Sequence, residues 1–285
     1  IRDRYEIKGK QFQANARREV VISAGTINSP QILQLSGVGP GSLLQSLGIK
    51  VHKDVLGVGK NLRDHYATRL TARAKNVRTI NELSRGPLLV GEILKYAMGR
   101  QSILSLGPTL VYCFWHSNHF QRNNDLQISF TPASYALGRQ AKLDNFPGFS
   151  IASWVQRPVS SGWAKIKSSD PFEKPVIQPN YLDNFEDQRI IVEGIKISRK
   201  LMNSDPLAHF FDGEVYPGKA IQSDEELLDV ARDRSNTAYH LVGSCRMGPD
   251  NDKTSVVDNQ LRVKGFKNLR VIDASIMPCL LYTSD

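Results

Sequence analysis

The chain has 285 residues, of which 40% are hydrophobic and 23% charged, a composition that excludes an intrinsically disordered segment. Its net charge is +9, but the basic residues are scattered and form no block interleaved with aromatic residues, so no nucleic-acid binding is expected. The three cysteines, Cys113, Cys245 and Cys279, include no CxxC pair, so we expect neither a zinc site nor a disulfide framework.

We expect no membrane span in this sequence and no secretory signal in the stretch with which it opens. No stretch approaches the roughly 18 uninterrupted apolar residues that a transmembrane helix needs. The chain opens on Ile1 within the charged stretch IRDRYEIKGKQ, which predicts a strand pair rather than a leader. We therefore expect the natural N-terminus to lie upstream, and the sequence leaves the compartment undetermined.

The first strong pattern is REVVISAG, in which Val20, Val21 and Ile22 predict a buried parallel strand. In the following TINSPQILQLSGVGP, Ser29 as N-cap and Pro30 at the first helical position predict a helix. A strand that leads through small residues to a helix N-terminus is how an α/β fold presents backbone N–H groups to a ligand. The sequence therefore predicts a ligand-binding edge near this strand.

The middle and end of the chain mix strands with helices. Strands are predicted for TLVYCFWH and DLQISFTP, and FSIASWVQRPVSSGWAKI predicts a hairpin around a Pro/Ser/Gly turn. Helices are predicted for GEILKYAMG, for NFEDQRIIVEGIKISRKLM and for SDEELLDVARDR, whose Ser223 and Glu226 predict a capping box. The segments QLRVKG and NLRVIDAS predict two further strands. This mixture predicts a parallel α/β layer joined to a part built on an antiparallel sheet.

The stretch TAYHLVGSCRMG, residues 237–248, leaves three roles open for His240: a metal ligand with Cys245, a core histidine, or an acid–base residue. The metal role lacks further ligands at zinc-like spacing. Taken by itself, the histidine is best interpreted as a buried, hydrogen-bonded residue. A neutral imidazole that reaches a hydroxyl group can nevertheless take its proton, and a positioned general base contributes about 10²–10⁴-fold to a rate.

Five segments, in this order, resemble the glucose–methanol–choline (GMC) family of FAD-dependent oxidoreductases: SAGTINSPQILQLSGVGP, GVGKNLRDH, RPVSSGWAKIKSSDP with IQPNYL, YHLVGSCRMG and LRVIDASIMP. The resemblance runs from about Tyr5 to Pro278. It implies a mixed α/β and α+β fold, in which part of an FAD-binding dinucleotide fold is interleaved with a substrate domain on an antiparallel sheet. Residues 1–66 and 236–278 are then expected in the FAD-binding part, and residues 67–235 in the substrate-binding part.

The resemblance implies oxidation of a CH–OH group of an alcohol or sugar to a carbonyl, with hydride transfer to FAD and with oxygen or a quinone as electron acceptor. It gives His240 the catalytic role and places Tyr239 at the substrate. The FAD contacts that it implies are Ser23, Ala24, Gly25, Asn61, Asp273 and Ala274. Structural roles stay open beside these, namely close packing for the small residues and helix capping for Asp273. The choline-dehydrogenase-like branch, the insect glucose-dehydrogenase-like branch and a catalytically inactive relative all remain compatible with the sequence.

Two features of the family are absent from the sequence. The phosphate-binding GxGxxG is expected upstream of Ile1, and the second catalytic residue, His or Asn, is expected after Pro278. Residues 279–285, CLLYTSD, do not resemble the family and are expected to be a non-native tail. We therefore expect these 285 residues by themselves to bind no FAD.

Overall fold

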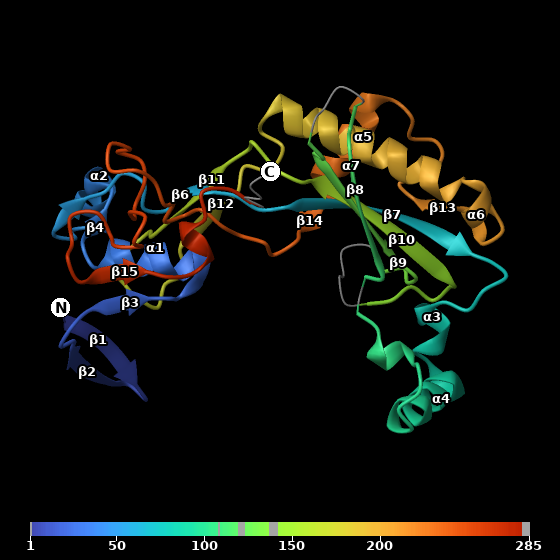
Figure 1. Cartoon of the computed structure of the whole chain (residues 1–285), viewed down its shortest axis with the longest axis horizontal. Helices are drawn as coiled ribbons and strands as arrows, with labels where there is room; N and C mark the ends of the chain where they lie inside the picture. The colour runs from blue at the N-terminus through green and yellow to red at the C-terminus, as the bar shows by residue number, and fades with distance from the viewer. Residues whose placement is uncertain (1, 108, 119–122, 137–141, 281–285) are drawn as a thin grey trace. The chain divides into compact units, whose positions relative to one another are not determined.

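The computed structural model describes residues 2–107, 109–118, 123–136 and 142–280 (Figure 1). The chain forms two compact units. Unit 1 comprises Ile1–Asp64, Ser160–Tyr181 and Tyr239–Asp285, and unit 2 comprises His65–Val159 and Leu182–Ala238. The expected continuous segment 67–235 is therefore interrupted. The reason is that Ser160–Tyr181 contains strands that pair within unit 1.

Unit 1 is built from short strands around two helices and a 3₁₀ turn. Its strands are β1 (Arg2–Ile7), β2 (Lys10–Asn15), β3 (Val20–Ile22), β4 (Val38–Gly39), β5 (Lys53–Asp54), β6 (Lys60–Leu62), β11 (Gly162–Lys165), β12 (Val176–Gln178) and β15 (Leu269–Val271). Its helical elements are α1 (Gly25–Leu35), α2 (Gly41–Ser46) and η2 (Ala274–Ile276). β1 pairs antiparallel with β2, which confirms the predicted strand pair, and β11 lies between β12 and β6.

The predicted parallel strand is β3, which pairs parallel with β15. The prediction that it is buried is wrong for one side, because Val21 is 45% exposed while Ile22 lies in the core. Among the described residues β3 pairs with β15 alone, so its second edge carries no strand there. The core of unit 1 joins this strand pair to Leu33 of α1 and to a buried Cys245.

Helix α1 begins at Gly25, with Ala24 as N-cap, and the predicted start at Ser29 is therefore wrong. Pro30 lies inside the helix, where it has no N–H to donate to the carbonyl of Thr26 four residues earlier. The hydroxyl of Ser244 donates to that carbonyl at 2.5 Å. A side chain 218 positions away thus supplies the donor that proline lacks, which is why the helix continues through it.

Unit 2 is an antiparallel sheet with helices. Its strands are β7 (Tyr66–Ala74), β8 (Val111–Trp115), β9 (Leu126–Thr131), β10 (Gly148–Val155), β13 (Phe211–Tyr216) and β14 (Asn236–Thr237). Its helical elements are α3 (Ile80–Leu83), α4 (Gly86–Ala97), η1 (Ile103–Ser105), α5 (Phe185–Met202), α6 (Asp205–Ala208) and α7 (Asp224–Arg234). The sheet order is β13-β7-β10-β9-β8, and β14 pairs with β7.

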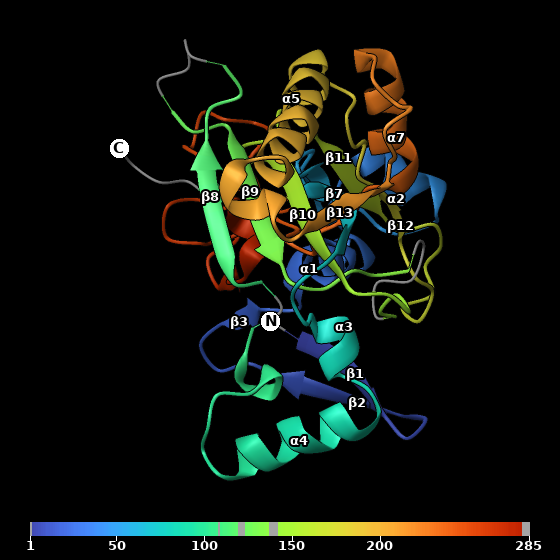
Figure 2. The ribbon, with the colours of Figure 1, turned by 90° about the vertical axis from the view of Figure 1, so that its right-hand side faces the viewer.

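The alternation of side chains along the strands gives this sheet two different faces. Leu70 and Ala72 of β7, with Ile151 of β10, point to the face that packs against Ile191 and Ile195 of α5. Figure 2 shows α5 and α7 beside the sheet strands. The other face carries the residues of β7 and β10 with the opposite parity, and half of these are polar, namely Arg69, Thr71, Arg73 and Ser150.

Most predicted elements of unit 2 are confirmed. The strands TLVYCFWH and DLQISFTP are β8 and β9, and the helix GEILKYAMG lies in α4. In α7 the side chain of Ser223 accepts from the N–H of Glu226, whose own side chain bonds back to the N-cap, so the capping box is present. The long predicted helix is α5, capped by Asn184.

The predicted hairpin is wrong, because its two strands join different sheets. β10 pairs with β7 and β9, whereas β11 pairs with β12 and β6.

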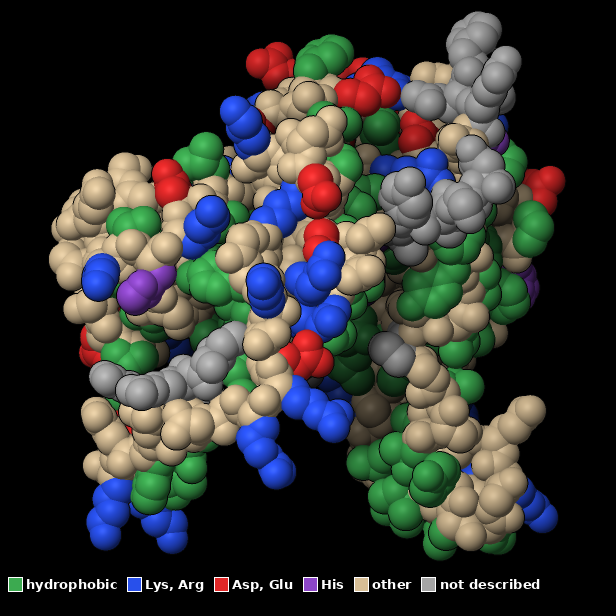
Figure 3. Space-filling model, turned by 60° about the vertical axis from the view of Figure 1, so that its left-hand side comes forward, with side chains coloured by type: hydrophobic (Ala, Val, Ile, Leu, Met, Phe, Trp, Pro, Cys, Tyr) green, Lys and Arg blue, Asp and Glu red, His purple; other side chains and the backbone are tan. Residues whose placement is uncertain are grey.

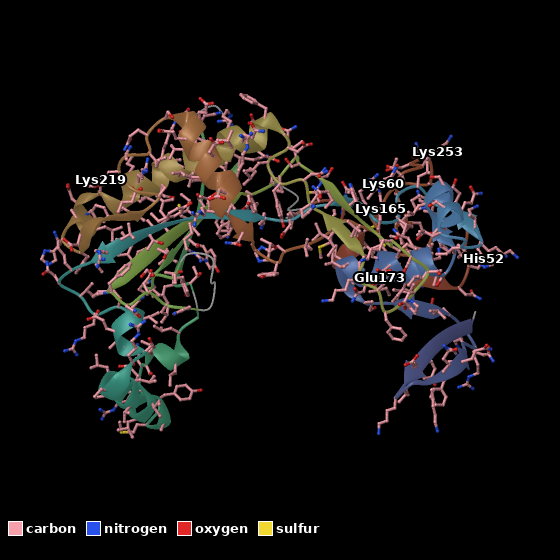
Figure 4. All side chains as sticks on the ribbon, turned by 180° about the vertical axis from the view of Figure 1, so that it is seen from behind. His52, Lys60, Lys165, Glu173, Lys219 and Lys253 are labelled. Atoms are coloured by element: carbon pink, nitrogen blue, oxygen red, sulfur yellow. The ribbon has the colours of Figure 1, made fainter. Side chains whose placement is uncertain are left out.

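The ammonium of Lys165 in β11 lies 4.1 Å from the ring centroid of Trp163, and Lys60 comes from the neighbouring β6 (Figure 4). QLRVKG forms isolated bridges through Arg262 and Val263 rather than a named strand.

The charged side chains are distributed rather than concentrated. On the face in Figure 3, basic and acidic groups are mixed, with hydrophobic side chains between them. None of the helices that the structure describes is long and apolar enough to cross a lipid bilayer. The part of the chain that is described also holds no group of three or more His, Cys, Asp or Glu residues that could hold a metal ion.

Candidate functional site: the α1 N-terminus and the His240 segment

Asp273, the second residue after the end of β15, is hydrogen-bonded to the first turn of α1. Its Oδ2 accepts a hydrogen bond from the N–H of Gly25 at 3.0 Å and one from the hydroxyl of Ser29 at 2.5 Å. Its Oδ1 accepts from the N–H of Ser275 at 2.8 Å. The hydroxyl of Ser29 accepts in turn from the N–H of Ala24 at 3.1 Å. Two N–H groups at the start of α1, which a helix leaves unpaired, are thereby satisfied by side chains.

The charge of Asp273 is stabilised by these contacts. Burial by itself would raise the pKa of this carboxyl, but the hydrogen bonds from Ser275, Ser29 and Gly25 outweigh it and hold the pKa below its usual value. A carboxylate is also favoured at a helix N-terminus by the helix dipole. Asp273 is therefore ionised at neutral pH and caps both α1 and η2, for which its side chain is the N-cap.

The His240 segment is held by its backbone on the turn that follows β6. The N–H of His240 donates to Oδ1 of Asp64 at 2.8 Å, and the hydroxyl of Tyr181 donates to Oδ2 of the same carboxylate at 2.6 Å. The backbones of Arg63 and Val242 exchange two hydrogen bonds, at 3.0 and 2.9 Å. The imidazole of His240 is solvent-exposed, and the side chain of the preceding Tyr239 is 71% exposed.

Gly243 of YHLVGSC allows this segment to pack closely against its neighbours. Gly243 has a φ of +90°, and a Cβ there would lie 2.4 Å from the carbonyl oxygen of Asn61, so only glycine fits. The side-chain amide of Asn61 donates to the carbonyls of Gly243 and Pro278, at 3.5 and 3.3 Å. Thr26 of α1 donates through its hydroxyl to Leu241 at 2.7 Å. The segment is therefore packed on both the Asn61 turn and the start of α1.

A cavity of about 500 Å³ lies beside β3 and α1. Its walls include Val21, Leu33 and Phe266, together with Ser23 and Ala24 at the end of β3. The walls are mainly apolar, and the volume is in the range of small-molecule sites. Ser23 and Ala24 therefore lie where a ligand at this strand end would be in contact with them.

The structure places all the residues that the resemblance assigns to the site in unit 1. Asp273 contacts Gly25 directly, Ala274 accepts from the N–H of Gly243, and Asn61 contacts Gly243 as well. Sequence reasoning missed Ser29, Ser244 and Asp64 as the groups that hold these segments together. Only Ser29 had a local signal, its place before Pro30, and it was interpreted as an N-cap.

Two other residues of the motifs, Cys245 and His65, are buried in structural surroundings. Cys245 is fully buried, and burial raises the pKa of its thiol to about 12, which agrees with a packing role. His65 is buried, and its Nε2 lies 2.9 Å from the carbonyl of Gln156, so its surroundings are those of a structural residue. Of the expected tail, Leu280 is buried, and residues 281–285 lie outside the described residues.

A parallel strand that ends at a helix N-terminus, as β3 does at α1, defines an α/β protein of the nucleotide-binding type. The chain belongs to the GMC oxidoreductase family. Family models described as GMC oxidoreductase match residues 4–67 and 158–283, together more than half of the chain. The match runs past Pro278 to residue 283, which does not support the expectation that the resemblance ends at Pro278.

Among similar proteins is an alcohol dehydrogenase (acceptor) of Pseudomonas putida, 38% identical over 95% of this chain and 49% of the relative. An oxygen-dependent choline dehydrogenase of Staphylococcus xylosus is 37% identical over 96% of this chain and 49% of the relative. A variant of the formate oxidase of Aspergillus oryzae, in which FAD modification was investigated, has a TM-score of 0.83 and 26% identity, with coverage of 95% of this chain and 52% of that one. The chain thus spans about half the length of the relatives that it matches.

Proposed function

We propose that this chain is part of an FAD-dependent oxidoreductase that oxidises a CH–OH group of an alcohol or sugar to a carbonyl. The observation that carries the proposal is that the α1 N-terminus, the Asn61 turn and the His240 segment are bonded together in one unit of a GMC-family chain. The names of the relatives, an alcohol dehydrogenase and a choline dehydrogenase, support a CH–OH donor.

The polar groups at the start of α1 fit the hydroxyl-bearing part of FAD better than its phosphates. The N–H groups of Ala24 and Gly25 are already engaged, and the carboxylate of Asp273 lies at the helix N-terminus. This negative charge disfavours a phosphate there. A carboxylate has about four acceptor sites, of which three are used, so one remains for a ligand hydroxyl.

Close approach of the cofactor is supported by Gly25. A Cβ built at this glycine would meet no atom within 4 Å, so bare backbone faces open space. With a φ of +84°, the position also favours glycine. We assign the FAD contacts to Ser23, Ala24 and Gly25, and to Asn61, Asp273 and Ala274, with the apolar cavity beside Ser23 and Ala24 as a site for a flat ring of the cofactor. Bound FAD would supply the hydride acceptor.

The protein's own residues then orient the substrate and move its proton. A ring nitrogen of His240 accepts the proton of the substrate hydroxyl, so that the carbinol carbon can become a carbonyl carbon. Asp64 acts as a positioning residue, because it binds the backbone N–H of His240. The exposed ring of Tyr239 contacts the substrate. Oxygen or a quinone is the final electron acceptor in this proposal.

The test is the substitution His240→Ala in the complete protein, with His209→Ala as control, because His209 is also an exposed histidine. Loss of a general base is expected to lower kcat by about 10²–10⁴-fold. FAD content, measured from the flavin absorption band, is expected to stay unchanged in both variants. If His240→Ala oxidises alcohols as fast as the wild type and the control, the catalytic role is refuted. A complete protein without flavin would refute the proposed cofactor.

A further inference from the structure

Helix α4 of unit 2 turns its apolar side toward solvent. Four apolar residues recur at positions i, i+3, i+4 and i+7, which places them on one side of an α-helix: Val90, Ile93, Leu94 and Ala97. Val90 is 57% exposed, Ile93 48% and Leu94 57%. A helix on the surface of a globular protein normally turns such a side to the core. In α4 this side faces outward, and an exposed apolar surface of this kind marks an interaction site.

The opposite side of α4 carries its charged residues and is the buried side. Glu92 is only 4% exposed. Its backbone carbonyl accepts from the hydroxyl of Ser102 at 2.8 Å, and its Oε2 accepts from the N–H of Ile103 at 3.0 Å. The ammonium of Lys95 donates to Oε1 of Glu92 at 2.6 Å. These hydrogen bonds fix the side of α4 that lies against η1, and turning the helix to bury its apolar side would break them.

Residues 84–107, which contain α4 and η1, form a projecting part of unit 2 that we call the α4 arm. Figures 1 and 2 both show α4 beyond the ends of the sheet strands and apart from α5 and α7. Within the unit, α4 packs against α3 and η1. Leu104 and Leu106, at η1, are exposed as well. In Figure 3 the hydrophobic side chains of this part gather at the lower right.

The charges of the α4 arm are complementary to an anionic surface. Glu92 is the single carboxylate among residues 84–107, all of which the structure describes, and it is buried and paired with Lys95. Arg85 directly precedes α4, and Arg100 lies three residues after the helix ends at Ala97. Both arginines are exposed. The arm therefore presents a cation at each end of an apolar helix and no exposed carboxylate.

The size of this apolar side argues against a protein partner that binds it alone. Helix α4 has 12 residues, so at a rise of about 1.5 Å per residue it is about 18 Å long. One side of a helix about 10 Å wide therefore offers on the order of 200 Å². A stable protein interface buries roughly 800 Å² on each partner. A lipid bilayer sets no such lower limit, because a single amphipathic helix can lie in its surface.

We propose that the α4 arm docks the protein on an anionic lipid bilayer. Helix α4 lies in the plane of the headgroups, with Ile93 and Leu94 in the outer acyl region and with Arg100 at the lipid phosphates. The ring of Tyr96, which is also exposed, has the amphipathic character that is favoured at a membrane–water interface. The proposal does not depend on the proposed oxidoreductase function, because binding to a membrane needs no turnover.

The test is flotation of the complete protein with vesicles of equal amounts of phosphatidylcholine and phosphatidylglycerol, compared with pure phosphatidylcholine. We expect the partition coefficient to be about 10-fold higher on the mixed vesicles and to fall with added salt. Ile93→Gln combined with Leu94→Gln should lower it by about 10-fold or more. Phe185→Gln combined with Leu201→Gln, at exposed apolar positions of α5, is the matched control and should change it by less than about 2-fold. Arg100→Gln should lower binding to the mixed vesicles by about 5-fold and leave binding to pure phosphatidylcholine unchanged.

Leu94→Trp decides the question if the double glutamine variant does not fold, because it keeps α4 apolar. Its fluorescence, compared with that of the wild type, should shift to shorter wavelengths when mixed vesicles are added. A wild type that does not float, equal binding to both kinds of vesicle, equal binding of the glutamine variants, or no shift for Leu94→Trp would overturn the proposal. A dimer in sedimentation velocity that Ile93→Gln with Leu94→Gln abolishes, without vesicle binding, would overturn it in favour of a second copy. A lower urea midpoint for this variant, again without vesicle binding, would show that the rest of the complete chain covers α4.

Discussion

The substitution Asp273→Asn tests whether this carboxylate holds the start of α1 in place. The wild-type side chain accepts from two backbone N–H groups, of Gly25 and Ser275, at its two different oxygens, and from the hydroxyl of Ser29. An asparagine has one acceptor oxygen and one NH₂ group. In either orientation of the amide, one backbone N–H therefore faces a donor and loses its partner.

The expected loss of stability follows from these contacts. A hydrogen bond to a charged group contributes roughly 1.5–3 kcal/mol, and a carboxylate at a helix N-terminus adds about 0.3–1 kcal/mol. Because Asp273 is only half-buried, solvent screening places the sum in the lower part of the combined range. We expect Asp273→Asn to lower the free energy of unfolding by about 2–3 kcal/mol.

The assay is urea unfolding, with Asp250→Asn as control because Asp250 is an exposed carboxylate of the same unit. The midpoint should fall for Asp273→Asn with an unchanged m-value, and the control should remain within about 0.5 kcal/mol of the wild type. The pKa of Asp273 is depressed in the folded state, so its contribution is present above the unfolded pKa of about 3.9. It is lost as the pH falls through the folded value. The gap between wild type and variant should therefore narrow below about pH 4. A midpoint for Asp273→Asn equal to that of the control would refute the reasoning.

Two further substitutions test contacts that hold each unit. Ser244→Ala should lower the free energy of unfolding by about 1–3 kcal/mol in urea, because it leaves the carbonyl of Thr26 without a donor. This loss should be smaller in a Pro30→Ala background, where residue 30 regains an N–H that can donate to the same carbonyl. Additive losses for the two substitutions would contradict this reasoning. Glu214→Gln should cost about 3–5 kcal/mol, because Glu214 forms a bidentate pair with Arg199, at 2.8 and 3.0 Å, and the two side chains are only 6% and 15% exposed. Glu193→Gln breaks the more exposed ion pair with Lys196 on α5, the helix that also carries Arg199, and should cost at most about 1 kcal/mol. Equal losses of stability in Glu214→Gln and Glu193→Gln would show that burial does not set the energy of these ion pairs.

Local patterns were sufficient where the interactions that decide an element are local. The capping box at Ser223 and the acidic first turn and basic last turn of α5 are short-range features, and both helices were predicted. The start of α1 was missed for the opposite reason. Pro30 inside a helix is tolerated here because Ser244 supplies a donor from a distant part of the chain, and no local pattern contains that information.

The hairpin prediction was wrong for a related reason, because distant strands decide how β10 and β11 pair. Two apolar runs on either side of a Pro/Ser/Gly turn can pair with each other, but β10 finds longer partners in β7 and β9, and β11 pairs with β6. A pocket lined by residues of β7, β9, β10 and β13, Arg69 among them, was also not predicted from the sequence. Alternation along β7 was available as a signal, since Arg69 and Thr71 flank Leu70. Which face carries a pocket, however, depends on strand order and on the helix that covers the other face.

The conformation of Tyr239 explains how His240 is positioned. Tyr239 has a φ of +60°, a left-handed conformation that costs a non-glycine residue roughly 1–2 kcal/mol. On its two sides, Ala238 donates its N–H to the carbonyl of His65, and His240 donates its N–H to the carboxylate of Asp64. The strained residue thus connects two anchored neighbours, and the surrounding hydrogen bonds outweigh its cost. Because the hydrogen bond to Asp64 uses the backbone N–H of His240, it is retained in His240→Ala, and an unchanged FAD content in that variant would assign a change in rate to the lost imidazole.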